Sequence, residues 1–140
     1  MKVESYLFFE GRTEEALEFY KQAIGAEVQM LMRYKDSPEP PKEGCTPPNS
    51  GDKVMHSSFR VGETLVMASD GMCSGKPDFK GFALSLSPGT DAEAQTLFSA
   101  LSQGGQVMQP LIKTFFASSF GMVTDKFGVM WMVIVESSGK

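Results

Sequence analysis

The feature that most constrains the fold of this 140-residue chain is an order of predicted elements that occurs twice. Each half is predicted to form a strand, a helix and then three strands, and corresponding residues recur at a nearly constant spacing: Phe98 corresponds to Tyr20, and Gly104 corresponds to Gly25. Such self-similarity is typical of a duplicated unit. Since neither half is long enough to bury a good core alone, we expect a single α+β domain over residues 1–140.

The expected architecture is two βαβββ modules, the first at about 1–70 and the second at about 80–136. Pairing the modules would form curved mixed sheets around a cleft, and a cleft of this kind suits a small-molecule ligand.

In the first module, Thr13 is the expected N-cap of a helix, because Glu14 and Glu15 follow it and favour the positive end of the helix dipole. Gly25 ends the helix. Gly62-Glu63 predicts a type II′ hairpin turn. The strands of this module are expected at residues 3–9, 26–35, 54–61 and 64–69.

In the second module, Thr90 and Glu93 form the pattern of a capping box, and Gly104 with Gly105 closes the helix that follows. The strands of this module are expected at residues 82–87, 106–114, 116–124 and 129–135. Between the first module's strands, the proline-rich segment 36–53 predicts a long surface loop, of a kind that usually acts as a lid or a partner-binding arm.

Charge and hydropathy exclude several classes of protein. The net charge of −4 leaves no basic stripe for a nucleic-acid backbone. The apolar runs are far shorter than the roughly 20 residues of a membrane helix, and Glu4 comes too early for a signal peptide. We therefore expect a cytoplasmic protein that binds neither nucleic acid nor a membrane.

The few potential metal ligands restrict the chemistry further. Cys45 and Cys73 form no CxxC pair, which excludes a zinc ribbon. His56 is the single histidine, so one chain cannot build a two-histidine metal site.

His56 and Asp70 are the candidate catalytic residues. His56 lies in the middle of a predicted strand, where it could serve as an acid, a base or a hydrogen-bonding group in the cleft, or pack as a half-buried structural histidine. Asp70 and Asp125 each precede a glycine-containing turn, and a turn role is favoured for both. Asp70 would become an acid–base partner if it faced the same cleft as His56.

The motifs together resemble a known family. The paired βαβββ modules, the EALEFY segment at residues 15–20 and the turn from Asp125 to Gly128 resemble the vicinal oxygen chelate superfamily, which includes glyoxalase I, bleomycin-resistance proteins and extradiol dioxygenases. One branch of this superfamily also has the motifs that stand here as Tyr6-Leu7-Phe9-Gly11, Val54-Met55-His56, Asp70-Gly71 and Phe127-Gly128-Val129-Trp131. The sequence is most similar to this PhnB-like branch, often labelled 3-demethylubiquinone 3-methyltransferase-like.

The resemblance implies a site without the family's usual metal ion. The four positions that hold the ion in metal-using members fall at Ser5, Met67, Gly81 and Met132. Thioethers, a hydroxyl and a glycine are poor ligands for a hard or borderline cation, so we expect no metal and no cofactor. The methyltransferase label lacks support, because no glycine-rich turn follows the first strand.

These observations lead to one main hypothesis and two alternatives. The main one is a metal-free small-molecule-binding protein of the glyoxalase/bleomycin-resistance type, which binds an apolar or mixed aromatic ligand beside Tyr6, His56, Met67 and Met132. It would be a homodimer, with the proline-rich loop as a clasp. Strand alternation assigns Trp131 to the core. The alternatives are a lyase, isomerase or dioxygenase that uses His56 and Asp70, and an interaction protein without a small ligand.

Overall fold

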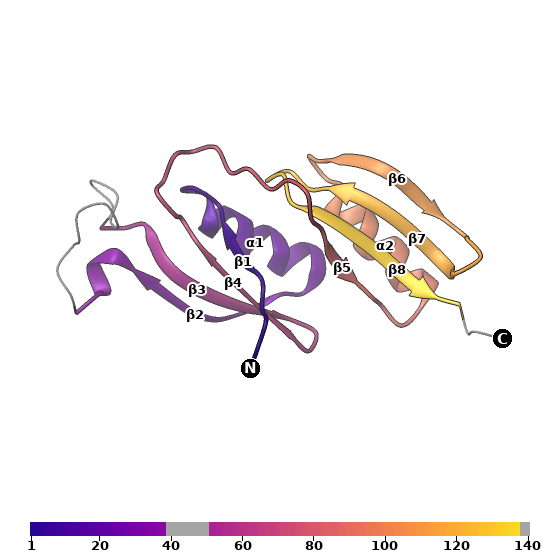
Figure 1. The fold of residues 1–140 in the computed structure, drawn as a ribbon, viewed down its shortest axis with the longest axis horizontal. Helices are drawn as coiled ribbons and strands as arrows, with labels where there is room; N and C mark the ends of the chain where they lie inside the picture. The colour runs from indigo at the N-terminus through magenta and orange to yellow at the C-terminus, as the bar shows by residue number, and fades with distance from the viewer. Residues whose placement is uncertain (39–50, 138–140) are drawn as a thin grey trace. The chain divides into compact units, whose positions relative to one another are not determined.

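The computed structural model describes residues 1–38 and 51–137, and the chain divides into two compact units, Met1–Pro77 and Asp78–Lys140. Each unit contains a four-stranded sheet and one α-helix, and Figure 1 shows the ribbon of the chain with these elements labelled. The predicted α+β class with two βαβββ modules is confirmed.

The first unit begins with β1 (Tyr6–Phe8) and α1 (Thr13–Ile24) and continues with β2 (Glu27–Arg33), a short 3₁₀ helix (Tyr34–Asp36), β3 (Val54–Val61) and β4 (Thr64–Ser69). The strand order in its sheet is β1-β4-β3-β2. The pairing of β1 with β4 is parallel, and the other two pairings are antiparallel.

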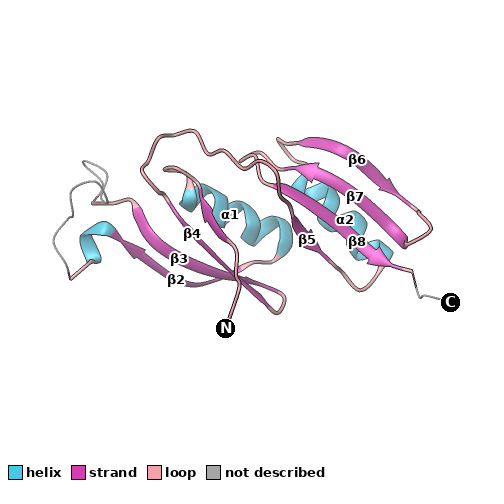
Figure 2. Ribbon diagram, in the orientation of Figure 1, coloured by secondary structure: helices cyan, strands magenta, loops and turns pink. Residues whose placement is uncertain are grey.

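The second unit repeats this topology with β5 (Leu84–Leu86), α2 (Asp91–Leu101), β6 (Gln106–Ile112), β7 (Ala117–Thr124) and β8 (Met130–Glu136). Its strand order is β5-β8-β7-β6, again with one parallel pairing, between β5 and β8 (Figure 2). The identical order in both sheets agrees with a duplicated unit.

In each unit the helix packs against one face of the sheet and defines a helix face and a helix-free face. The α1 side chains Ala16, Leu17 and Tyr20 are buried, and the Tyr20 ring stacks on Phe59 of β3 at 5.8 Å between centroids. In the second unit, Phe98 of α2 and Trp131 of β8 are buried. The prediction that Trp131 belongs to the core is confirmed, since it is 2% exposed.

The N-terminus of α1 differs from the prediction. Thr13 is the first helical residue and not the N-cap; Arg12 occupies the N-cap position, with no side-chain capping bond. The Thr13 hydroxyl is buried without a hydrogen-bond partner. A carboxylate from the end of β4, Asp70, accepts the Thr13 amide instead, so the cap comes from a residue that is distant in the sequence.

The other caps and turns follow local chemistry. Gly25 ends α1 with φ of 70°, and the Thr90 hydroxyl accepts the Glu93 amide at the start of α2, as predicted. The C-cap of α2 is Ser102 in a right-handed conformation, and Gly104, with φ of 73°, follows in the next turn. Gly62 has φ of 56°, which suits the first central position of a type II′ turn.

Most of the proline-rich segment predicted as a loop, residues 39–50, lies outside the described residues. The strand predicted at 3–9 is shorter than expected, because only Tyr6–Phe8 pairs with β4. Among the described residues, no helix is long and apolar enough to span a membrane.

Candidate functional site

The helix-free face of the first sheet carries most of the candidate ligand-binding residues. The sheet register pairs Tyr6 with Met67, Met67 with Ser58, and Met32 with His56. Paired residues project to the same side of a sheet, and residues two apart on one strand share that side. Tyr6, His56 and Met67 therefore lie on one face, which we call the first helix-free face.

A hydrogen bond joins the two polar side chains of this face. The Tyr6 hydroxyl lies 2.9 Å from His56 Nδ1. Because β4 lies between β1 and β3 in the sheet, the Tyr6 side chain must cross β4 to reach His56. The bond occupies Nδ1 and orients the imidazole, so a ligand would meet the ring through Nε2.

Three rings form a row on the first helix-free face. The Tyr6 ring lies 4.9 Å from Phe8 and 5.5 Å from His56 between centroids, with interplanar angles of 33° and 31°. Phe8 is 51% exposed, although it is a large apolar side chain. A row of tilted rings with one end open to solvent offers π surface to a flat partner.

Methionine side chains extend the apolar part of the same face. Met30 pairs with Ser58 and Met32 pairs with His56, so both lie on the same helix-free side of the sheet as Met67. Met30 is 40% exposed. Thioethers are flexible and make favourable contacts with aromatic rings. The period-two pattern of β2 is the sequence signal that assigns Met30 and Met32 to one face of the sheet.

Met132 belongs to the second unit. It pairs with Ser85 of β5 and Met122 of β7, on the side opposite Trp131 and α2. It therefore lies on the helix-free face of its own sheet, as alternation along β8 requires.

The sheet register shows which residues lie beside Met67 and Met132, two of the positions that the resemblance assigned to metal ligands. Tyr6, not Ser5, lies beside Met67, and Ser85, not Gly81, lies beside Met132. A phenol, a hydroxyl and two thioethers still do not suit the divalent ion of the family's metal-using members. Among the described residues, no three His, Cys, Asp or Glu side chains gather closely enough to hold a metal ion.

Asp70 takes a structural position. It is 2% exposed, and its two carboxylate oxygens accept the backbone amides of Thr13 at 2.9 Å and Val54 at 2.8 Å. These bonds hold the end of β4 against the starts of α1 and β3. The hydrogen bond of His56 goes to Tyr6, so the structure does not join the two candidate catalytic residues through a hydrogen bond.

Asp125 has the turn role that its sequence context favours. One carboxylate oxygen accepts the amides of Phe127 and Val129, and the other accepts the indole N–H of Trp131 at 2.9 Å. The residue shapes the β7–β8 turn and fixes the buried indole.

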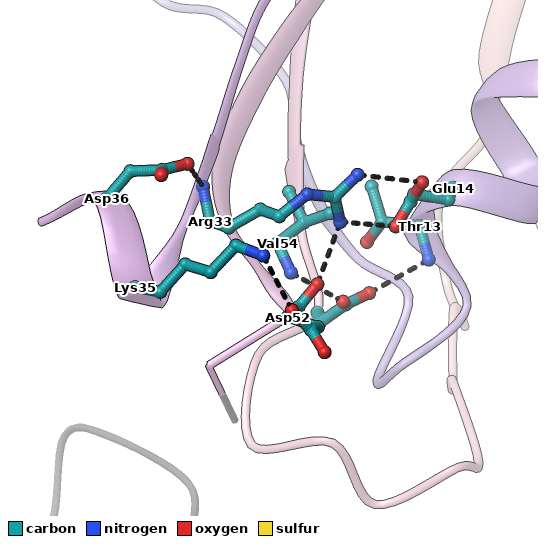
Figure 3. A network of polar contacts seen from close by, with 8 residues as sticks. Thr13, Glu14, Arg33, Lys35, Asp36, Asp52 and Val54 are labelled. Atoms are coloured by element: carbon teal, nitrogen blue, oxygen red, sulfur yellow. Dashed lines mark hydrogen bonds and ion pairs between the residues drawn. The ribbon is translucent and has the colours of Figure 1, made fainter. Parts of the chain in front are cut away.

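Charged side chains near the surface connect the start of α1 with the end of β2 and the segment before β3 through hydrogen bonds and ion pairs (Figure 3). The Arg33 guanidinium donates to both carboxylate oxygens of Glu14 and to the Asp52 carbonyl, and Lys35 pairs with the Asp52 carboxylate at 2.8 Å. The hydrogen bond from Arg33 lowers the pKa of Glu14, and the bond from Lys35 lowers the pKa of Asp52. Local sequence gave no signal for these contacts, because their partners are distant along the chain.

Comparison with known proteins identifies the family. The model of the family described as 3-demethylubiquinone-9 3-methyltransferase matches residues 1–134. The Escherichia coli protein YjdN is 32% identical over 140 residues, covering 96% of this chain and 95% of that protein.

This chain belongs to that family. Two solved structures support the assignment. Protein PA1353 from Pseudomonas aeruginosa is 41% identical, with a TM-score of 0.82 over 97% of this chain and 98% of that one. The PhnB protein from Bacillus cereus is 30% identical, with a TM-score of 0.76 over 96% and 99%. The predicted PhnB-like resemblance is confirmed.

The wider fold is that of the glyoxalase/bleomycin-resistance group. The fosfomycin resistance protein FosX from Mesorhizobium loti is 9% identical, has a TM-score of 0.64 and covers 99% of this chain and 93% of that one, which shows the fold alone. The family's methyltransferase name is not supported by this fold. Each sheet has one parallel pairing among three, unlike the doubly wound parallel sheets that bind nucleotide cofactors at their strand ends.

Proposed function

We propose that this family member is a metal-free small-molecule-binding protein of the glyoxalase/bleomycin-resistance type. Its ligand would contact Tyr6, His56 and Met67 on the first helix-free face. Met132, on the helix-free face of the second unit, stays a predicted ligand-binding residue. The observation that carries the proposal is the Tyr6–His56 hydrogen bond beside the exposed Phe8 ring. An ordered polar pair within an apolar, partly exposed surface is the usual composition of a ligand site.

Side-chain chemistry favours binding without a metal ion. Met67 lies beside Tyr6 in the first sheet, and Met132 lies beside Ser85 in the second sheet. Their thioethers and hydroxyls suit apolar and neutral hydrogen-bonding groups better than a divalent ion.

A binding screen with matched variants tests this proposal. The protein would be labelled with ¹³C at its methionine methyl groups, and small planar compounds would be added while the NMR signals of Met67 and Met132 are followed. We expect saturable shifts of the Met67 signal, and we expect Met67→Ala to weaken binding. Met72→Ala, in the loop after β4, is the control. A library that shifts no signal from the first helix-free face would contradict the proposal.

Metal content is tested separately. The protein as purified would be dialysed and analysed for metals by mass spectrometry. Stoichiometric metal that survives dialysis would overturn the metal-free part of the proposal.

An enzyme on the same face, a lyase, isomerase or dioxygenase, is the second candidate. It is favoured by the orientation of His56, whose Nδ1 is engaged by Tyr6, because an oriented imidazole can act as a general base through Nε2. Asp70 would not assist, since two backbone amides occupy its carboxylate. A turnover that His56→Gln abolishes in a folded protein would favour the enzyme over the binding protein. The homodimer and the cytoplasmic location expected from the sequence stay predictions, and analytical ultracentrifugation tests the first.

A further inference from the structure

We propose that the ligand is a planar aromatic compound that carries an anionic or strongly accepting oxygen, such as a carboxylate or phenolate, and that the Tyr6–His56 pair binds this oxygen. This inference rests on the proposed function and narrows it to one ligand class.

The protons of the pair provide the first argument. A neutral imidazole has one N–H and one nitrogen lone pair, and a phenol has one O–H. If Tyr6 donates to Nδ1 in the 2.9 Å bond, the Nε2–H of His56 is left to donate. If Nδ1–H donates to Tyr6, the Tyr6 O–H is left to donate. In either tautomer the pair therefore keeps a donor for a ligand oxygen, and a cationic His56 would keep two.

The charges of the first helix-free face provide the second argument. Among the described strand residues of this face, Glu27 is the carboxylate, and Arg60 pairs with it at 2.7 Å. A cationic ligand group at Tyr6–His56 would thus lose its water without gaining a free counter-charge, which is costly. An anionic ligand oxygen would accept a hydrogen bond from the Tyr6–His56 pair, and a hydrogen bond with a charged acceptor is stronger than one between two neutral groups.

The surroundings of the pair define the rest of the ligand. The Tyr6 ring lies 4.9 Å from the Phe8 ring between centroids. The strand register places Met67 beside Tyr6 and Met32 beside His56, and Met30 lies two residues before Met32 on the same face. Rings and thioethers both favour contact with a flat π system. A ring that lies on Phe8 and Met67 would direct an attached oxygen towards the pair.

Two probes of the same shape and opposite charge test the inference. They are 2-naphthoate and 2-naphthylmethylammonium, titrated at pH 7.5 while the Met67 and Met30 methyl signals are followed. We expect the wild-type protein to bind 2-naphthoate about tenfold more tightly, which is the scale of one charge-assisted hydrogen bond. Tyr6→Phe and His56→Gln should each remove most of this preference. Tyr34→Phe makes the same chemical change in the 3₁₀ helix and should keep it.

Each outcome has a distinct meaning. Circular dichroism and thermal melting establish that each variant is folded. If His56→Gln does not fold, Tyr6→Phe still tests the inference, because this conservative substitution removes the hydroxyl and keeps the ring. If the wild-type protein binds the two probes with equal affinity, or if the preference for 2-naphthoate survives both substitutions, the proposed ligand class is wrong. The proposal that ligands bind on the first helix-free face would not be affected by that result. If neither probe shifts the Met67 or Met30 signals, the binding face itself, and with it the proposed function, is wrong.

Discussion

Removal of the Asp70 carboxylate is the change whose effect on stability can be worked most directly from the structure. The side chain is 2% exposed and accepts two backbone amides, Thr13 N at 2.9 Å and Val54 N at 2.8 Å. Asp70→Ala would leave both donors buried without an acceptor, and each unpaired donor costs about 1–3 kcal/mol. It would also remove a negative charge from the N-terminus of α1.

We therefore expect Asp70→Ala to lower the free energy of unfolding of the first unit by about 4 kcal/mol, a large share of the usual 5–15 kcal/mol of a small protein. Asp70→Asn retains one acceptor oxygen and should cost about half as much. Asp78→Asn, at a largely exposed carboxylate, is the control and should change stability by less than about 0.5 kcal/mol.

Urea unfolding provides the measurement, with the midpoint and slope compared between variants. Two probes are needed, because the single tryptophan, Trp131, lies in the second unit whereas Asp70 lies in the first. Far-UV circular dichroism reports both helices, and tryptophan fluorescence reports the second unit. If Asp70→Ala unfolds at the wild-type urea concentration by both probes, the assignment of Asp70 as a long-range cap is refuted.

Three further predictions concern other parts of the chain. Arg33 lowers the pKa of Glu14, so the ion pair stabilises the fold at neutral pH, and this stabilisation is lost as the pH falls through the titration of the carboxylate. Glu14→Gln should therefore lower the free energy of unfolding by less than about 1 kcal/mol at neutral pH. It should also reduce the dependence of stability on pH in the acid range. Gly105→Ala should lower the free energy of unfolding by more than about 2 kcal/mol, because the added Cβ would lie 2.2 Å from the Thr124 carbonyl oxygen. Gly89→Ala is the control: its Cβ would have nothing within 4 Å, so thermal melting should be unchanged. Trp131→Phe should cost about 1–3 kcal/mol in urea unfolding, since it removes the buried N–H donor to Asp125; an unchanged midpoint would contradict this.

The sequence by itself determined the order of elements and the faces of the strands. The resemblance to the family assigned Met67 and Met132 to the cleft, and alternation along β8 then assigned Trp131 to the opposite face, which is the helix face. Gly25 and Thr90 ended and began the helices as local backbone chemistry requires. These features depend on residues a few positions apart, so a single sequence contains the information needed to predict them.

Only the tertiary structure decided which distant residues meet. The register between β1 and β4 placed Tyr6, and not Ser5, beside Met67, and a shift of one residue in a strand reverses the face of a side chain. The same pairing brought Tyr6 to His56, and the end of β4 brought Asp70 to the start of α1. Hydrogen bonds between residues fifty or more positions apart depend on how strands align in space, and local spacing in the sequence does not encode that alignment.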